Sequence, residues 1–159
     1  ADVDIPDSGA EGVIMAMGGS VGGWSFYAKG GKLKFCYNFF GIEHYFAEST
    51  DTLPTGHHQV RMEFAYDGGG IAKGGDVTLY VDGKQIGAGR VDRTEPMGFS
   101  ADETLDVGIE NGSPVSPDYG PQGNAFTGNV NWVQMDVGKD DHDHMISPDE
   151  RFKLAMARQ

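Results

Sequence analysis

Polar and apolar residues alternate along short stretches of this chain. In "VRMEF", residues 60–64, valine, methionine and phenylalanine alternate with arginine and glutamate, and "VTLYV", residues 77–81, repeats the alternation. Successive side chains of a β-strand point to opposite faces. A period of two therefore predicts strands with one face in a core and the other in water.

Runs of this kind recur along the chain, separated by glycine, proline or an Asp-Gly pair. They cover residues 12–18, 23–29, 32–40, 43–49, 57–66, 76–82, 84–91, 105–110 and 125–138. Asp82 and Gly83 predict a type I′ hairpin turn, which needs positive φ at both central positions. The pattern predicts an all-β fold, an antiparallel β-sandwich or jelly roll of about nine to twelve strands.

Two segments depart from the strand pattern. Residues 111–124, "NGSPVSPDYGPQGN", hold too much proline and glycine for a strand or helix and predict a loop. Near the C-terminus, Ser147, Pro148 and Glu150 match the N-cap, first and third positions of a helix. We therefore expect a β-sandwich domain over residues 1–138, with a linker and a short C-terminal helix in residues 139–159.

Composition narrows the classes of partner. The net charge of −12 argues against nucleic acid and anionic membrane surfaces as partners. Cys36 is the single cysteine, which excludes an internal disulfide and a cysteine zinc site. There is no apolar run of about 18 residues to span a membrane. The first residues lack a signal-peptide pattern, so we expect a chain cut from a longer precursor or not exported by itself, and the compartment stays open.

The glycine-rich stretch "AYDGGGIAKGGD", residues 65–76, invites comparison with a phosphate-binding loop. Such a loop places its lysine and a serine or threonine after the last glycine, at the start of a helix. Here Lys73 precedes its glycine pair and a predicted strand follows. The stretch instead predicts a hairpin connection whose glycines allow close approach to another surface.

Metal ligands are present only in weak patterns. Within "DDHDH", residues 140–144, His142 and His144 are suitable ligand types for a divalent metal, but a solvated linker is the favoured interpretation. Asp102 and Asp106 belong to an acidic stretch that resembles calcium-binding loops in ligand type, with no diagnostic spacing. We expect no cofactor and keep calcium as the candidate ion.

Catalytic patterns are lacking as well. Glu103 and Asp106 are three residues apart and would face opposite sides of a strand, unlike the paired carboxylates of glycoside hydrolases. His57 and His58 are adjacent and opposed, and there is no G-x-S-x-G sequence. We therefore predict no catalytic residue.

Several aromatic residues could form a platform for stacking sugars. The candidates for ligand binding are Trp24, Tyr37, Tyr45 and Trp132, with Asn38 as a hydrogen-bonding neighbour. A sandwich core also uses aromatic side chains, and a single sequence cannot separate the two roles. Both interpretations stay open at this point.

Four phrases, in this order, resemble the C-terminal region of large bacterial arylsulfatases. They are "GGWSFYAKGGKLKFCYNFFGIEHY", "VRMEFAYDGGGIAKGGDVTLYVDGKQIGAGRV", "RTEPMGFSADETLDVGIENGSPVSPDYG" and "FTGNVNWVQMDVG". The resemblance spans residues 12–138, and "MISPDERFKLAMARQ" is similar to the tail of such chains. It implies a concanavalin-like or laminin-G-like β-sandwich appended to an α/β sulfatase domain.

The resemblance does not bring the sulfatase catalytic motif with it. Sulfatases carry C-x-[PS]-x-R, whereas the only cysteine here lies in "FCYNFF". The resemblance therefore implies a non-catalytic accessory domain of an arylsulfatase-type sulfuric ester hydrolase, which stabilises the catalytic domain or shapes access to it. Its partner would be the sulfatase catalytic domain, in the same chain or a separate one. The alternative from another class is a carbohydrate-binding module, and an independent lyase or hydrolase would need a cleft that the sequence does not reveal.

Overall fold

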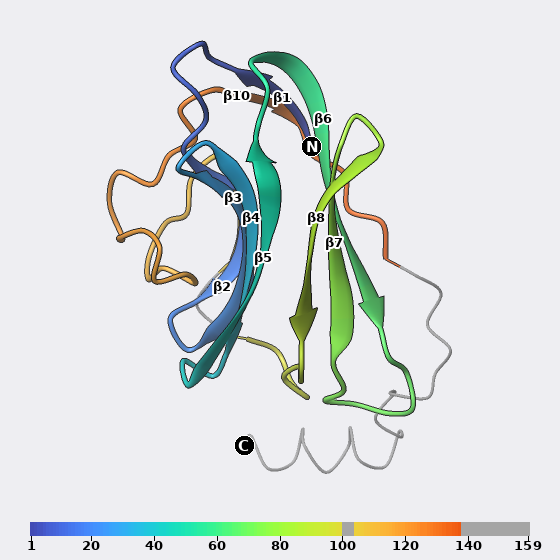
Figure 1. Ribbon diagram of the computed structural model, residues 1–159. Helices are drawn as coiled ribbons and strands as arrows, with labels where there is room; N and C mark the ends of the chain where they lie inside the picture. The colour runs from blue at the N-terminus through green and yellow to red at the C-terminus, as the bar shows by residue number, and fades with distance from the viewer. Residues whose placement is uncertain (100–103, 138–159) are drawn as a thin grey trace.

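The computed structural model describes residues 1–99 and 104–137, which contain ten strands (Figure 1). These are β1 (Asp2–Ile5), β2 (Gly12–Gly19), β3 (Gly22–Lys29), β4 (Lys32–Phe39), β5 (Glu43–Thr52), β6 (Gly56–Tyr66), β7 (Gly75–Val81), β8 (Lys84–Val91), β9 (Leu105–Val107) and β10 (Asn129–Trp132). The prediction of an all-β chain is confirmed.

The strands follow one continuous order, β10-β1-β6-β7-β8-β5-β4-β3-β2-β9. Every pairing between neighbouring strands in this order is antiparallel. Over the same described residues there is no helix long and apolar enough to cross a membrane. The linker and helix predicted for residues 139–159 lie outside the described part of the chain.

The sheet is bent so that β2–β5 face β6–β8, as Figure 1 shows. The two halves are joined where β5 pairs with β8, through Gly87 and Gly89. A Cβ atom at Gly87 would lie 2.4 Å from the Glu48 carbonyl oxygen, and one at Gly89 would lie 2.4 Å from the Phe46 carbonyl oxygen. Because no side chain fits in these gaps, glycine at both positions is what allows this pairing.

The main hydrophobic core fills the space between the facing halves. Leu33 and Phe35 of β4 and Val77 and Leu79 of β7 are all at most 3% exposed and belong to one cluster. Val60 of β6 joins them, while its polar neighbours in the strand face water. The alternation predicted from the sequence is therefore confirmed in β6 and β7.

A second, smaller core lies on the outer face of β2–β4, beneath the loop of residues 111–124. Tyr27 and Cys36 are fully buried there, and Tyr119 of the loop packs edge-on against Tyr27. The Tyr27 hydroxyl donates to Asp118 Oδ2 at 2.7 Å. Burial raises the pKa of the Cys36 thiol to about 12, which makes this cysteine a packing residue.

The observed turns and strand ends can be compared with those predicted from the sequence. Asp82 and Gly83 have φ of 48° and 78°, as predicted for the hairpin between β7 and β8. β1 was not predicted, because four residues are too few to display a period. The last predicted runs, 105–110 and 125–138, contain only β9 and β10. Gly108, at φ 77°, follows the end of β9, and residues 125–128 cross the start of β2 instead of continuing a ladder.

Antiparallel connections alternate between the two ends of the sheet. One end carries the loops 20–21, 40–42, 67–74 and 92–99, and we call it the aromatic end. The other carries the loops 6–11, 30–31, 53–55 and 82–83, and we call it the polar end. In Figure 1 the aromatic end is at the bottom and the polar end is at the top.

Candidate functional site

A row of large side chains crosses five strands close to the aromatic end. Strand register pairs Leu105 with Met17, Met17 with Trp24, Trp24 with Tyr37 and Tyr37 with Tyr45. Directly paired residues of antiparallel strands share a face of the sheet. The structure therefore brings together three of the predicted binding residues on the concave face, next to two aliphatic residues that the sequence did not single out.

Exposure changes along this row. Leu105 and Met17, at the β9 edge, are 47% and 40% exposed, whereas Tyr37 is 6% exposed. Trp24 is half-buried, packs against the main core and stacks on Phe35 with ring centroids 6.4 Å apart. One face of the indole is thus used in packing.

Tyr37 packs in the core and also accepts a hydrogen bond through its hydroxyl group. Its hydroxyl accepts a hydrogen bond from the Glu95 backbone N–H at 2.8 Å. Burial first, and then the nearby carboxylate of Glu95, raise the pKa of Tyr37 to about 12. Tyr66 belongs to β6, so hydroxyl groups from both halves of the sheet meet at this end.

Asn38 lies on the opposite face from the row and is fully buried. Its Nδ2 donates to the Gly19 carbonyl oxygen at 2.9 Å, and its Oδ1 accepts from the Gly41 N–H at 2.8 Å. The amide therefore links the β2–β3 and β4–β5 hairpin tips. A sugar could reach it only by displacing these bonds.

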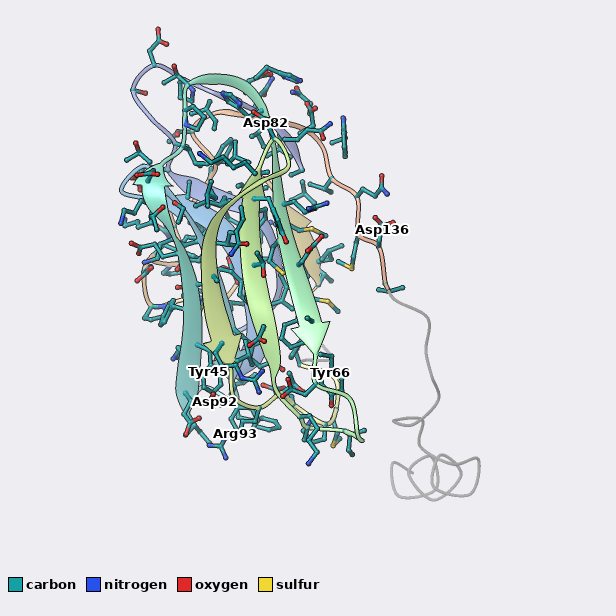
Figure 2. All side chains as sticks on the ribbon, turned by 45° about the vertical axis from the view of Figure 1, so that its right-hand side comes forward. Tyr45, Tyr66, Asp82, Asp92, Arg93 and Asp136 are labelled. Carbon is teal, nitrogen blue, oxygen red and sulfur yellow. The ribbon has the colours of Figure 1, made fainter. Side chains whose placement is uncertain are left out.

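Tyr45 is part of an exposed polar group at the aromatic end. Its hydroxyl donates to Glu43, and Arg93 donates to Glu43 Oε1 at 2.7 Å. These two hydrogen bonds, from Tyr45 first and then Arg93, lower the pKa of Glu43. The Arg93 guanidinium also lies 4.4 Å from the Phe39 ring centroid. Figure 2 shows Tyr45 and Arg93 at the same end as Tyr66.

Glu95 is a residue of this end that sequence reasoning missed. Its carboxyl is buried, and Oε1 accepts from the Phe40 N–H at 2.8 Å, while Oε2 has no hydrogen-bond partner among the residues that the structure describes. Burial raises its pKa, which favours the protonated acid. A Cβ at Gly22 would lie 2.2 Å from Oε1, so glycine makes room for the carboxyl. No period or spacing in the sequence marks this position.

The loops of the aromatic end expose apolar side chains. These side chains are between 44% and 74% exposed, and they are Val21, Phe40, Ile42, Ile71 and Met97. They come from four different loops that the topology brings to one end. The glycine-rich connection 67–74 is one of them, and Gly68, Gly69 and Gly70 have nothing within 4 Å of an added Cβ.

The remaining predicted site residues lie elsewhere. Trp132 is on β10, at the far end of the strand order from β9, and is 47% exposed. Asp106 is on β9 and its Oδ2 accepts from the Asn111 N–H at 2.6 Å. Asp102, His142 and His144 lie outside the described residues. In residues 1–99 and 104–137, no group of three or more His, Cys, Asp or Glu side chains could hold a metal ion.

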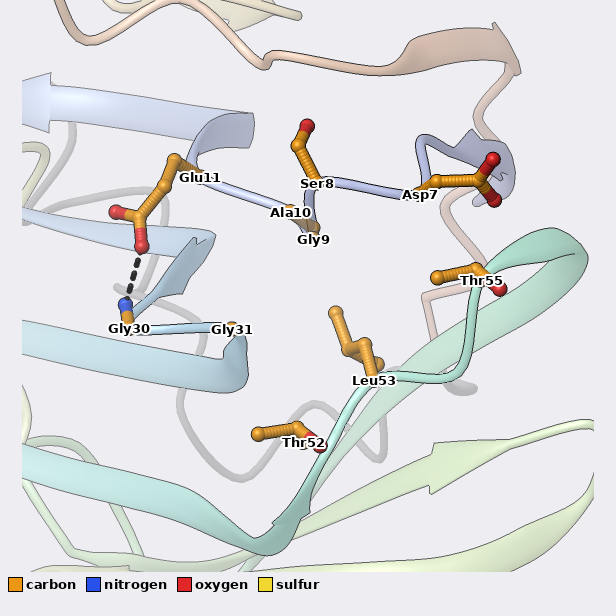
Figure 3. A pocket seen from close by; sticks show the side chains of 10 residues that line it. All are labelled: Asp7, Ser8, Gly9, Ala10, Glu11, Gly30, Gly31, Thr52, Leu53 and Thr55. Atoms are coloured by element: carbon orange, nitrogen blue, oxygen red, sulfur yellow. Dashed lines mark hydrogen bonds between the residues drawn. The ribbon is translucent and has the colours of Figure 1, made fainter.

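The polar end has a shallow pocket of about 400 Å³, drawn in Figure 3. It lies between the loops 6–11, 30–31 and 53–55, with Leu53 at its base and hydroxyl and carboxylate groups around it. Glu11 Oε1 accepts from the Gly30 N–H at 2.6 Å, which ties two of these loops together. No pattern in the sequence predicts this pocket, because its lining comes from three separate connections.

Comparison with known proteins adds no relative to this picture. No family model, no curated protein and no solved structure matches the chain. The function of the chain must therefore be inferred from the geometry of the two ends and from the four stretches of sequence that resemble arylsulfatases.

Proposed function

We propose that this chain is a non-catalytic accessory domain of an arylsulfatase-type sulfuric ester hydrolase. In this proposal, the two facing halves of the sheet are those of a concanavalin-like or laminin-G-like sandwich. The four phrases of the resemblance support the proposal. The chain contributes no residue to sulfate ester hydrolysis and acts by stabilising the catalytic domain or shaping access to it.

The observation that carries the proposal is the set of exposed apolar loop tips at the aromatic end. Val21 and Ile42 are 59% and 74% exposed on neighbouring hairpins, with Gly41 packed against the Ser20 carbonyl between them. Apolar side chains grouped on the surface of a soluble domain mark contact with another protein. We assign the sulfatase catalytic domain as the occupant, in the same chain or a separate one.

The glycine-rich hairpin fits this role. Tyr66 fixes its fold, since the hydroxyl donates to the Gly70 carbonyl at 2.6 Å and accepts from the Lys73 N–H at 3.0 Å. Nothing lies within 4 Å of an added Cβ at Gly68, Gly69 or Gly70. Because glycine has no side chain, a partner can approach the backbone closely there. In the proposed function this hairpin and the loop tips form one contact surface.

The test joins the chain to the catalytic domain of a bacterial arylsulfatase that lacks its own C-terminal region. Thermal unfolding and hydrolysis of 4-nitrophenyl sulfate are measured with and without the chain. We expect the chain to raise the unfolding temperature of the catalytic domain, and the isolated chain to hydrolyse nothing. The Val21→Ser/Ile42→Ser variant should lose the effect.

A matched control is Lys84→Ser, on the polar end, which should keep the full effect because it lies away from the contact surface. Equal unfolding temperatures with and without the chain would contradict the proposal. A Lys84→Ser variant that loses the effect as completely as the loop-tip variant would contradict the placement of the contact.

The alternative function, a carbohydrate-binding module, is favoured by one observation. Trp132 is 47% exposed on an outer strand, and an exposed indole is a stacking surface for sugars. Titration of tryptophan fluorescence with sulfated and neutral oligosaccharides, with and without calcium, tests it. A saturable change that disappears in Trp132→Ala would put this function first, and an unchanged spectrum across the panel would remove it.

A further inference from the structure

Strand β1 lies between β10 and β6 and carries two carboxylates, Asp2 and Asp4, two residues apart on one face. Asn131 of β10 contacts both, since its Nδ2 donates to Asp2 Oδ1 and to Asp4 Oδ2 at 3.0 Å each. His57 of β6 contacts the same two carboxylates from the other side. An amide and an imidazole therefore hold this pair of like charges between them.

The geometry of His57 specifies its protonation state. Its Nδ1 lies 2.9 Å from Asp4 Oδ1, and its Nε2 lies 3.3 Å from Asp2 Oδ2. Ionised carboxylates only accept hydrogen bonds, and a neutral imidazole has a single N–H to donate. Both contacts are favourable only when the ring carries two protons and a positive charge.

His58 repeats this arrangement on the opposite face of β6. Its Nδ1 lies 2.7 Å from Asp82 Oδ2 in the β7–β8 turn, and its Nε2 lies 3.1 Å from the Thr55 carbonyl oxygen. Both partners are acceptors, so this ring is also satisfied only as an imidazolium. Asp82 Oδ1 in addition accepts from the Gln59 N–H at 2.9 Å.

We propose that His57 and His58 form a proton-operated clasp that holds strand β1 and the β7–β8 turn against the first residues of β6. The charged groups that face the two rings are Asp2 and Asp4 of β1 and Asp82 of the turn, and the β10 side contributes only the neutral Asn131. When each ring loses one proton it keeps a single N–H, so one of the two acceptors around each ring then faces an imidazole lone pair. β1 then keeps only one of its two hydrogen-bonding contacts with His57.

The direction of the pH response follows from the pKa shifts of the two rings. The hydrogen bond to Asp4, followed by the charge of Asp2, raises the pKa of His57 above its ordinary 6.5. The hydrogen bond to Asp82 raises the pKa of His58 in the same way. A base with a raised folded-state pKa stabilises the fold fully below its unfolded pKa and loses this as pH rises through the folded value. The clasp is therefore closed below pH 6.5 and opens above it.

Two measurements on the full chain test the clasp. The first follows the imidazole Cε1–H resonances of His57 and His58 by NMR against pH, and both should titrate above 6.5. The second follows hydrogen exchange of the backbone amides in residues 2–5 at pH 6.0 and pH 8.5, corrected for the intrinsic rate. Protection should fall at the higher pH in the wild-type chain.

The double variant His57→Gln/His58→Gln keeps polar side chains but cannot gain protons. Protection of residues 2–5 in this variant should be the same at both pH values. A matched control is His44→Gln, since His44 stacks on Phe46 and belongs to a different strand. The control should keep the wild-type pH dependence.

Titration of either ring at or below 6.5 would overturn the clasp, as would a wild-type pH dependence in the double variant. If the double variant does not fold, Asp2→Asn/Asp4→Asn provides the second test. It should lower the pKa of His57 and leave that of His58 nearly unchanged. An unchanged His57 titration in that variant would show that β1 does not hold the proton.

Discussion

The two ends of the sheet differ in one buried carboxyl group and in the partners of their exposed carboxylates. At the aromatic end Glu95 is buried with one hydrogen bond to a single oxygen, and burial raises its pKa. At the polar end Asp4 and Asp82 have lowered pKa values, Asp4 first through its hydrogen bond to His57 and Asp82 first through the Gln59 N–H. The aromatic end also holds Glu43 and Asp67, whose pKa values are lowered by hydrogen bonds from Tyr45 and Arg93 and from Arg90. The contrast is therefore between one buried carboxyl with a raised pKa beside exposed apolar loop tips and carboxylates paired with histidines at the polar end.

These pKa shifts make the free energy of unfolding depend on pH. A carboxyl with a raised pKa, such as Glu95, costs stability as pH rises above its unfolded value of 4.5. The histidines of the polar end cost stability as pH rises above 6.5. Rising pH therefore acts on Glu95 first and on the two histidines afterwards.

The largest effect is expected at the seam that holds the two halves together. Gly89→Val places a Cβ within 2.4 Å of the Phe46 carbonyl oxygen and should disrupt both ends at once. We expect a loss of about 3 kcal/mol or more in the free energy of unfolding, measured by urea denaturation. Ala88→Val, on the exposed face of the same strand, is the control and should change stability little. A tolerated Gly89→Val would show that the seam is not tightly packed.

A smaller effect is expected for the hydrogen bond that anchors the loop 92–99. Tyr37→Phe removes the acceptor of the Glu95 N–H and leaves a buried donor without a partner, at a cost of about 1–2 kcal/mol. Tyr80→Phe removes an exposed hydroxyl bond to Glu63 and should cost close to nothing. Equal unfolding free energies for the two variants would mean that the Tyr37 hydroxyl does not anchor the loop.

Glu95→Gln sharpens the contrast between the ends because it removes the charge but keeps an acceptor for the Phe40 N–H. The variant should be more stable than wild type at pH 8 and equal to it near pH 4. The difference grows as pH rises above 4.5, because only the wild-type side chain ionises. Urea denaturation over this pH range measures it. A variant that is less stable than wild type at pH 8 would contradict the raised pKa of Glu95.

The smallest effect on stability is expected at the loop tips. Val21→Ser/Ile42→Ser changes side chains that already face water, so the unfolding free energy of the isolated chain should change by less than about 0.5 kcal/mol. If wild type and variant are equally stable, a loss of the effect on the catalytic domain in the variant reports lost partner contact and not a folding defect. A large loss of stability here would mean that these side chains pack within the domain.

The sequence predicts the parts of the fold that repeat a local rule. Alternation locates β6 and β7, and Asp82-Gly83 locates the hairpin between β7 and β8, because period and turn chemistry are properties of neighbouring residues. It does not predict that Gly87 and Gly89 form the seam, since that depends on carbonyl oxygens of β5. Contacts between strands that are distant in the sequence do not change the local pattern of polar and apolar residues.

The same limit applies to the candidate site. Trp24, Tyr37 and Tyr45 were grouped by residue type, and only strand register shows that they share one row. Asn38, grouped with them, faces the other way because it is one residue from Tyr37 in the same strand. Glu95 could not be predicted, because its burial depends on the space that Gly22 leaves in another hairpin.

The most direct test of the central claim is a hydrogen-exchange footprint of the chain, alone and joined to the arylsulfatase catalytic domain. The aromatic end should gain protection in residues 20–22, 40–42 and 67–74, while residues 30–31 and 82–83 at the polar end exchange as before. Protection confined to the polar end, or no difference at either end, would contradict the claim that the aromatic end is the surface through which this domain acts.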